Sequence, residues 1–425
     1  MSVINDDFSP KRKTSIQSQE ISNYLTKMKG NHQKGTNVRE TQNTQIVSGQ
    51  TAAMTSSTAE EDGSQKALPT TYLYSTVSLP QNHTMTNSPV NPNGNYTCAA
   101  PITTVVFIKS YKTGSTTLAS IFQRFGYRHK LLFALPKRGH IFSTPSLFTR
   151  RLVQPKPKHL TNRSYDILTN HAVYNRKEME AVVPNAKYIA IARDPVYQFE
   201  SAFGYFELAK VMGLENYSHP FDTFMKDPLY YYTNTRYKWQ TAIKNGQLYC
   251  YGIFPNSYKN MSEANLPEKI KQIDKEFDLV LLTDYFDESL ILLKQLLCWE
   301  YEDIIYLSKG VRKDDHRYNI SDEMKLKIRR WNAGDVLLYD RFNGTFWEKI
   351  ANYGPSFDSD LAEFRRLKQI ATEKCVSKDK VNTKDRRFYK LLSANRKDVY
   401  CNDLLRYDIT YTSMLKKKMS ELFAN

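Results

Sequence analysis

The sequence predicts an α/β domain in which helices cover both faces of a central parallel sheet. Four short runs rich in β-branched and apolar residues occur at 103–108, 165–170, 187–193 and 277–283. The chain has 425 residues, of which 40% are hydrophobic, so it can build a large core. Helical spacing follows the first, third and fourth runs, and strands that alternate with helices are typical of parallel sheets.

Each predicted element has its own local signal. The run TTVVFIK is followed by a glycine-containing turn and then by Leu118, Ile121 and Phe125 at helical spacing. The run KYIAIAR precedes a helix that begins at Pro195, and FDLVLLT precedes the apolar helix DESLILLKQLLCW. Ligands of such sheets bind beyond the carboxyl ends of the strands, so the residues that follow each strand are the first candidates for a site.

The organisation of the chain changes at about residue 100. Residues 1–100 are rich in Ser, Thr, Asn and Gln and predict a disordered stem or tail. We expect the α/β domain over 101–355. Residues 356–425 read as a helical extension packed on that domain, and the block 331–340 reads as core packing of a late helix.

Charge and composition exclude several classes of protein. The formal net charge of +16 lies almost entirely in residues 101–425, which suggests an anionic partner such as a nucleotide, an acidic glycan, a nucleic acid or a membrane face. A disordered chain, a collagen-like fibre and a small disulfide scaffold are excluded. No run of 18 apolar residues is present, and the N-terminus lacks the pattern of a signal peptide.

The five cysteines lack the spacing of a zinc site, so no metal is expected. Cys375 and Cys401 both fall in the helical extension and are candidate partners if the compartment is oxidising; the odd number leaves at least one free thiol. A secretory route is suggested by seven N-x-S/T sequons, at Asn82, Asn95, Asn162, Asn216, Asn260, Asn319 and Asn343.

A loop after the first strand has the features of a phosphate site. Gly114 permits close backbone approach at the start of a helix, Ser115, Thr116 and Thr117 carry hydroxyls, and Lys112 adds a positive charge. Because the lysine precedes the glycine, the loop is not a Walker A motif. An ordinary strand-to-helix turn is the alternative interpretation.

A second loop follows the third strand. Arg193 ends that strand and Ser201 lies eight residues later in the next helix. An arginine fork binds a phosphate through two hydrogen bonds, and a hydroxyl adds a directed donor. An arginine at a strand end is more often a surface or salt-bridge residue, but the two loops are more specific together than either is alone.

Residues 101–350 resemble the galactose 3-O-sulfotransferase family of Golgi carbohydrate sulfotransferases. The resemblance lies in FIKSYKTGSTTLASIFQRFGYRH, ALP at 134–136, ILTNHAVYN, ARDPVYQFESAFGYF and RRWNAGDVLLYDRFNGTFW. It implies a P-loop-like sulfotransferase fold and a site for 3'-phosphoadenosine 5'-phosphosulfate (PAPS). Tyr111 and Asp194 depart from the residues expected at those places.

The resemblance also assigns roles. Lys112 would contact the bridging and leaving oxygens of the donor, and His171, directly after the second strand, would be the general base, with His129 and His140 as rivals and Glu200 as a weaker candidate. The implied donor-binding set is Lys109, Thr113, Gly114, Ser115, Thr116, Thr117, Arg193 and Ser201. No metal is required, because cationic side chains can supply the charge.

The implied reaction moves a sulfuryl group to the 3-hydroxyl of terminal galactose in a glycolipid or glycoprotein glycan. The family implies a lumenal, membrane-associated Golgi protein, although no anchor is visible in this sequence, and no nucleic acid is expected as a partner. Three alternatives stay open: a sulfotransferase for another sugar position, a non-catalytic basic glycan-binding protein and a nucleotide kinase.

Overall fold

The computed structural model describes residue 98 and residues 100–421, with gaps at 143–145, 157, 255–264, 310–311, 314–316, 378–380 and 383–388. The stem expected over 1–100 lies almost wholly outside the described residues. All described residues belong to one compact unit, Pro89–Asn425. The catalytic domain expected over 101–355 and the extension expected over 356–425 both lie within this unit.

The central sheet has four parallel strands, as the sequence predicts. They are β1 (Val105–Ile108), β2 (Ile167–Leu168), β3 (Lys187–Ala192) and β4 (Leu279–Leu282), in the order β2-β1-β3-β4. β1 lies between β2 and β3, so Val105 is opposite both Ile167 and Lys187. The strands are short and apolar because they are buried on both faces, which is typical of parallel sheets.

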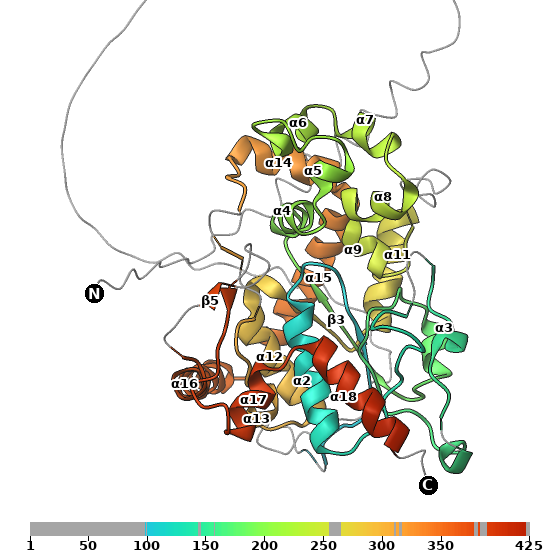
Figure 1. Ribbon diagram of the computed structural model, residues 1–425, viewed down its shortest axis with the longest axis vertical. Helices are drawn as coiled ribbons and strands as arrows, with labels where there is room; N and C mark the ends of the chain where they lie inside the picture. Colours follow the sequence, from blue (N-terminus) through green and yellow to red (C-terminus); the bar gives the residue numbers. More distant parts are fainter. Residues whose placement is uncertain are drawn as a thin grey trace, which may run out of the picture. The chain divides into compact units, whose positions relative to one another are not determined.

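Helices follow three of the strands directly. They are α2 (Ser115–Arg128), α4 (Pro195–Tyr205) and α12 (Phe286–Leu297), which confirms the predicted alternation (Figure 1). The other helices are α3 (Arg176–Glu180), α5 (Leu208–Val211), α6 (Pro220–Lys226), α7 (Pro228–Thr233), α8 (Tyr237–Ile243), α9 (Gly246–Cys250), α11 (Asn265–Glu276), α13 (Tyr301–Ile304), α14 (Asp322–Trp331), α15 (Ala333–Ala351), α16 (Phe357–Cys375), α17 (Val399–Leu405) and α18 (Asp408–Glu421). Short 3-10 turns occupy Arg150–Leu152, Lys158–Leu160 and Thr283–Tyr285.

A second, smaller hydrophobic cluster forms beside α4. Phe199 and Phe203 of α4 pack against Phe221 and Phe224 of α6, and Ile328 of α14 joins them. In Figure 1 these helices gather with α5, α7 and α8 at the upper end of the view. This cluster packs against the apolar residues of α4, the helix that carries Ser201.

The C-terminal region is mostly helical, as predicted, but a small antiparallel sheet interrupts it. β5 (Val381–Asn382) pairs with β6 (Tyr389–Lys390) between α16 and α17. The last helix, α18, lies alongside α2 in the same compact unit (Figure 1). The region therefore packs directly against the helix that follows β1.

Two disulfides bond four of the five cysteines. Cys375–Cys401 is the pair that the sequence suggested, and Cys98–Cys298 is a pair that it did not. Cys250 is a buried free thiol, as the odd number requires. No helix within the described part of the chain is long and apolar enough to cross a bilayer.

Candidate active site

The loop from Lys109 to Ser115 joins β1 to α2 in a constrained conformation. Gly114 precedes the helix with φ +71°, a left-handed conformation that glycine adopts without strain. Lys112 has φ +62°, which is costly for a residue with a side chain. The first N–H groups of a helix have no partners within the helix, and the dipole makes that end favourable for an anion.

Hydroxyl groups inside this loop hold its shape. The Ser110 hydroxyl donates to the Ile191 carbonyl at 2.5 Å and lies 2.9 Å from the Thr113 hydroxyl. The Ser115 hydroxyl donates to the Ser110 carbonyl at 2.6 Å. Thr113 and Ser115 are buried, whereas Gly114 is exposed and Thr116 is partly exposed. The sequence analysis assigned the hydroxyls of Thr113, Ser115, Thr116 and Thr117 to an anion, but those of Thr113 and Ser115 are engaged within the loop.

Thr283, just after β4, fastens the loop to the sheet. Its hydroxyl lies 2.7 Å from the Thr113 carbonyl and 3.0 Å from the Ala192 carbonyl. One side chain thus links the carboxyl ends of β3 and β4 to the β1–α2 loop. Sequence analysis did not single out this residue, because a threonine after a strand has no local signal of such a role.

Arg193, directly after β3, brings the two predicted loops together. Its Nη1 donates to the Lys112 carbonyl at 3.2 Å. Its backbone is held on both sides by Gln247, which accepts from the Arg193 N–H at 2.9 Å and donates to the Arg193 carbonyl at 2.8 Å. The Arg193 Nε is buried with no hydrogen-bond partner among the described residues.

The Arg193 guanidinium is suited to an anion. Burial lowers the pKa of Arg193, whereas the nearby charges of Asp284, Glu200 and Asp194 raise it. No carboxylate in the described part of the chain lies within ion-pair distance of its guanidinium. A buried guanidinium that no carboxylate contacts directly is stabilised when an anionic ligand pairs with it. The orphaned Nε and the fork geometry therefore fit a phosphate group.

Ser201 lies on the face of α4 that is turned toward the first loop. Gln198, three residues earlier, donates from Nε2 to the Tyr111 carbonyl at 3.0 Å. Tyr205, four residues later, has its ring centroid 4.0 Å from the Lys112 ammonium. Residues at this spacing share one helix face, so Ser201 lies between two residues that contact the loop.

The contacts that hold Gln247, and through it Arg193, come from the block 331–340. Asp335 of α15 accepts from the backbone N–H groups of Gln247 and Leu248 at 3.1 and 2.8 Å. A β-carbon at Gly334 would lie 2.6 Å from Leu248 Cδ1 and 3.0 Å from Asn245 Nδ2, so a larger residue would force these buried side chains to move. The prediction that this block packs in the core is confirmed, and its role is to hold α9 and hence Gln247.

His171 lies three residues after β2 and contacts the loop that joins β1 to α2. Its Nδ1 is 3.0 Å from the Lys109 carbonyl, and its ring stacks on Tyr111 with centroids 4.4 Å apart. Because a carbonyl only accepts, Nδ1 carries the proton in this contact and Nε2 keeps its lone pair. Burial, followed by the charge of Lys109, lowers the pKa of His171 well below its usual range. The imidazole is thus neutral at neutral pH.

The rival candidates for the base differ in placement. His129 caps the far end of α2, and its ring contacts that of Phe125 in a tilted arrangement with centroids 4.2 Å apart. His140 is exposed and close enough for its charge to lower the pKa of His171. Glu200 is buried in an ion pair with Arg312 and accepts from the Tyr318 N–H, so its carboxylate is engaged.

Two further residues differ from the expected donor-binding set. The Lys109 ammonium is buried in an ion pair with Asp408 rather than left unpaired for a donor. Arg312, which sequence analysis did not single out, is close enough to lower the pKa of Arg193, and its Nη1 has no partner among the described residues. No group of three or more possible metal ligands occurs in the part of the chain that the structure describes.

Comparison with known proteins identifies the family. The family model described as galactose-3-O-sulfotransferase matches residues 63–418. The chain belongs to the galactose-3-O-sulfotransferase family. The galactosylceramide sulfotransferase of Bos taurus is 34% identical over 296 residues, which are 68% of this chain and 68% of that protein. Galactose-3-O-sulfotransferase 3 of Mus musculus is 32% identical over 65% of this chain and 64% of that protein.

A solved sulfotransferase from Alicyclobacillus acidocaldarius shares 16% identity with a TM-score of 0.31, over 58% of this chain and 97% of the other. The family assignment rests on the family model and on the curated relatives. The resemblance seen in the sequence is therefore confirmed. The galactose-3-O-sulfotransferase match includes both loops, His171 and the late block that supports Arg193.

Proposed function

We propose that this chain transfers a sulfuryl group from PAPS to the 3-hydroxyl of terminal galactose in a glycolipid or glycoprotein glycan. Family membership makes it a galactose 3-O-sulfotransferase, an enzyme that transfers sulfur-containing groups. The observation that carries the proposal is the contact between Arg193 and the Lys112 carbonyl, which joins two anion-binding loops at one sheet edge.

The donor is held by two groups of residues in this proposal. The helix start at Gly114 and Thr116 binds the 5'-phosphosulfate, with Lys112 beside it, and Arg193 and Ser201 bind the 3'-phosphate. Thr113 and Ser115 maintain the loop rather than donate their hydroxyls. When bound, the donor supplies an electrophilic sulfur and a phosphate leaving group.

His171 acts as the general base. Its neutral Nε2 takes the proton of the galactose 3-hydroxyl as that oxygen attacks sulfur, while Nδ1–H remains bonded to the Lys109 carbonyl. Lys112 and the α2 N-terminus stabilise the negative charge that develops on the departing phosphate. Lys109 itself contributes its backbone carbonyl, because its ammonium is paired with Asp408.

The proposed compartment is the Golgi lumen. Two disulfides favour an oxidising compartment, and Asn162, Asn216 and Asn319 are exposed in sequons. Asn343 differs, because it lies within α15 and accepts from Trp347 Nε1 at 3.2 Å. When the protein is expressed through the secretory pathway, glycosidase treatment is expected to remove glycans from Asn162, Asn216 and Asn319 and none from Asn343.

The function is tested by mass spectrometry of sulfate transfer from PAPS to galactosylceramide, lactose and N-acetyllactosamine. We expect one sulfate at the galactose 3-hydroxyl, and the preferred member of the panel distinguishes a glycolipid from a glycan acceptor. Transfer to another hydroxyl would replace the 3-O assignment. A protein that binds the acceptor but neither binds PAPS nor transfers sulfate would favour the glycan-binding alternative.

A further inference from the structure

A buried charge pair joins the loop after β1 to a residue near the C-terminal end of the chain. Asp408, the first residue of α18, pairs with Lys109 at the end of β1, and the two side chains are only 8% and 5% exposed. In Figure 1, α18 runs beside α2, which follows the same loop. Removing one partner of a buried pair leaves an uncompensated charge, so this contact strongly constrains the backbone at Lys109.

A second contact of α18 reaches the other side of His171. Thr412, one turn after Asp408, accepts from Asn170 Nδ2 at 2.9 Å and from Gln123 Nε2 at 3.2 Å. Asn170 directly precedes His171, and all three of these polar side chains are buried. Two successive turns of α18 therefore hold the residue that bonds the imidazole and the residue that precedes it.

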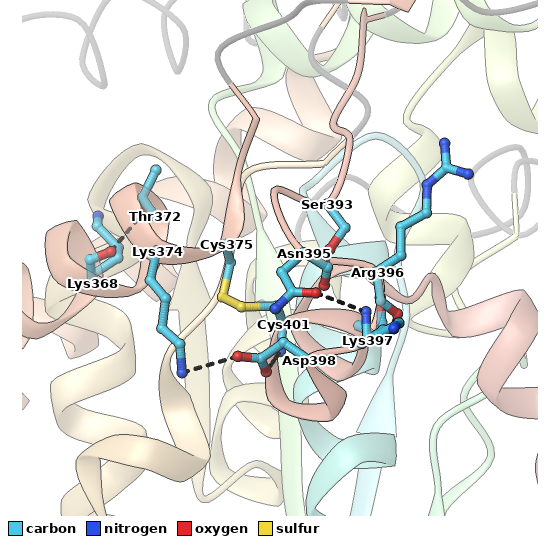
Figure 2. Close-up of a disulfide and its surroundings, with 11 residues drawn as sticks. Lys368, Thr372, Lys374, Cys375, Ser393, Asn395, Arg396, Lys397, Asp398 and Cys401 are labelled. Atoms are coloured by element: carbon cyan, nitrogen blue, oxygen red, sulfur yellow. Dashed lines mark hydrogen bonds and ion pairs between the residues drawn. A yellow bond between two sulfur atoms is a disulfide. The ribbon is translucent and has the colours of Figure 1, made fainter.

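A disulfide fixes the segment that leads into α18. Figure 2 shows the Cys375–Cys401 bond, which joins the end of α16 to α17. Beside it, Lys374 pairs with Asp398 at 3.1 Å, and Asp398 accepts from the Cys401 N–H at the start of α17. Because α17 ends at Leu405, only two residues separate this anchored helix from Asp408.

We infer that Asp408 is a positioning residue for the catalytic histidine. Through Lys109, it fixes the carbonyl that holds Nδ1–H of His171, and so it sets the direction in which Nε2 faces the acceptor hydroxyl. This inference rests on the proposed role of His171. It predicts that loss of the charge pair lowers turnover more than it weakens binding of either substrate, because Asp408 contacts neither.

The test compares the full-length Asp408→Asn variant with Asp403→Asn. Asp403 is a matched control, since it is buried in the same segment and pairs with Arg406, but makes no described contact with Lys109 or His171. We expect Asp408→Asn to lower kcat about 10- to 100-fold, because small displacements of catalytic groups have effects of this size. The acceptor KM and the Kd of adenosine 3',5'-bisphosphate should stay within about threefold in both variants.

A double variant separates positioning from simple charge balance. Lys109→Met with Asp408→Asn removes both charges, which restores stability relative to either single change. If the pair positions His171, kcat stays low in the double variant although its melting temperature recovers. Recovery of wild-type kcat would overturn the inference, as would an Asp408→Asn enzyme that turns over as fast as Asp403→Asn.

His171→Gln distinguishes the failure of this inference from the failure of the proposed mechanism. An inactive His171→Gln enzyme with normal Asp408→Asn turnover overturns only the positioning role. Near-normal turnover in His171→Gln overturns the assignment of the base, and the positioning role with it.

Discussion

Arg193 Nη1 donates a hydrogen bond to the Lys112 carbonyl at 3.2 Å, although the two residues are 81 positions apart in the chain. The acceptor residue has φ +62°, a conformation that its surroundings must enforce. One contact therefore both stabilises the strained loop and orients the arginine. The contact joins the two loops that we propose to bind the donor, so a disturbance of either is expected to affect the other.

Lys112→Ala is expected to lower kcat about 100- to 1000-fold, since loss of one group that stabilises developing charge has effects of this size. The fold should persist, because alanine has the same backbone restrictions at φ +62° as lysine. Turnover and melting temperature are measured together. Lys130→Ala is the matched control, because Lys130 also has positive φ, at +55°, but follows the opposite end of α2; near-normal turnover in Lys112→Ala would contradict the assigned role.

Arg193→Lys is expected to weaken the binding of adenosine 3',5'-bisphosphate by about 10- to 100-fold, because a lysine cannot both bind a phosphate as a fork and reach the Lys112 carbonyl. Calorimetry measures the Kd. Arg366→Lys, an exposed change on α16, serves as the control and should leave the Kd unchanged. Equal Kd values for the wild type, Arg193→Lys and Arg366→Lys would exclude Arg193 from the donor site.

Asp335→Asn is expected to change the pH dependence of stability. Burial raises the pKa of Asp335 to about 7, so the folded state binds a proton more tightly than the unfolded state. The contribution of Asp335 to stability is therefore largest below its unfolded pKa of about 4 and falls as pH rises toward 7. At about 1.4 kcal/mol per pKa unit, the decline is at most about 4 kcal/mol.

Thermal unfolding between pH 4 and pH 8 checks this expectation. The melting temperature of Asp335→Asn minus that of the wild type should increase with pH, because asparagine does not titrate. At low pH the variant should be the less stable protein, since its amide cannot accept from both Gln247 and Leu248 N–H groups. Parallel curves for the two proteins would show that Asp335 does not titrate in this range.

Gly334→Ala is expected to destabilise the protein by about 1 to 3 kcal/mol, because the new methyl group would overlap Leu248 and force α9 away from α15. Gln247 lies on α9, so the affinity for adenosine 3',5'-bisphosphate should fall as well. Gly344→Ala on the same helix meets nothing within 4 Å and should be neutral or stabilising by about 0.5 to 1 kcal/mol. Similar effects in both variants would indicate a general helix effect instead.

Local patterns predicted what depends on neighbours in the sequence. The runs at β1, β3 and β4 are short continuous apolar segments rich in β-branched residues, which favours buried strands, and the candidate site residues follow them. His171 and Arg193 were selected as candidates because they follow strands, and the structure places both beside the loop after β1. The Cys375–Cys401 pair was suggested because both cysteines fall in the C-terminal extension, and the structure contains this bond. The strand runs and the residues that follow them are signals within a few positions of the chain.

The supporting contacts could not be predicted because they join distant segments. Thr283, just after β4, is 170 positions from its partner Thr113 and 91 from its partner Ala192. Asp408 of α18 is 299 positions from Lys109. Gln247 bonds the backbone of Arg193, which any residue at that position would offer. Such contacts depend on the packed fold and leave no periodicity or motif.

The Cys98–Cys298 bond closes a covalent ring across a separation of 200 residues. All four strands of the sheet lie within that ring, together with Lys112, His171 and Arg193. A single peptide bond cut by a protease anywhere inside it would give two fragments that still migrate as one species without reductant. The nicked molecule would keep both anion-binding loops tethered to one another, whereas a cut beyond Cys298 and before Cys375 would release the C-terminal helices once their packing is lost.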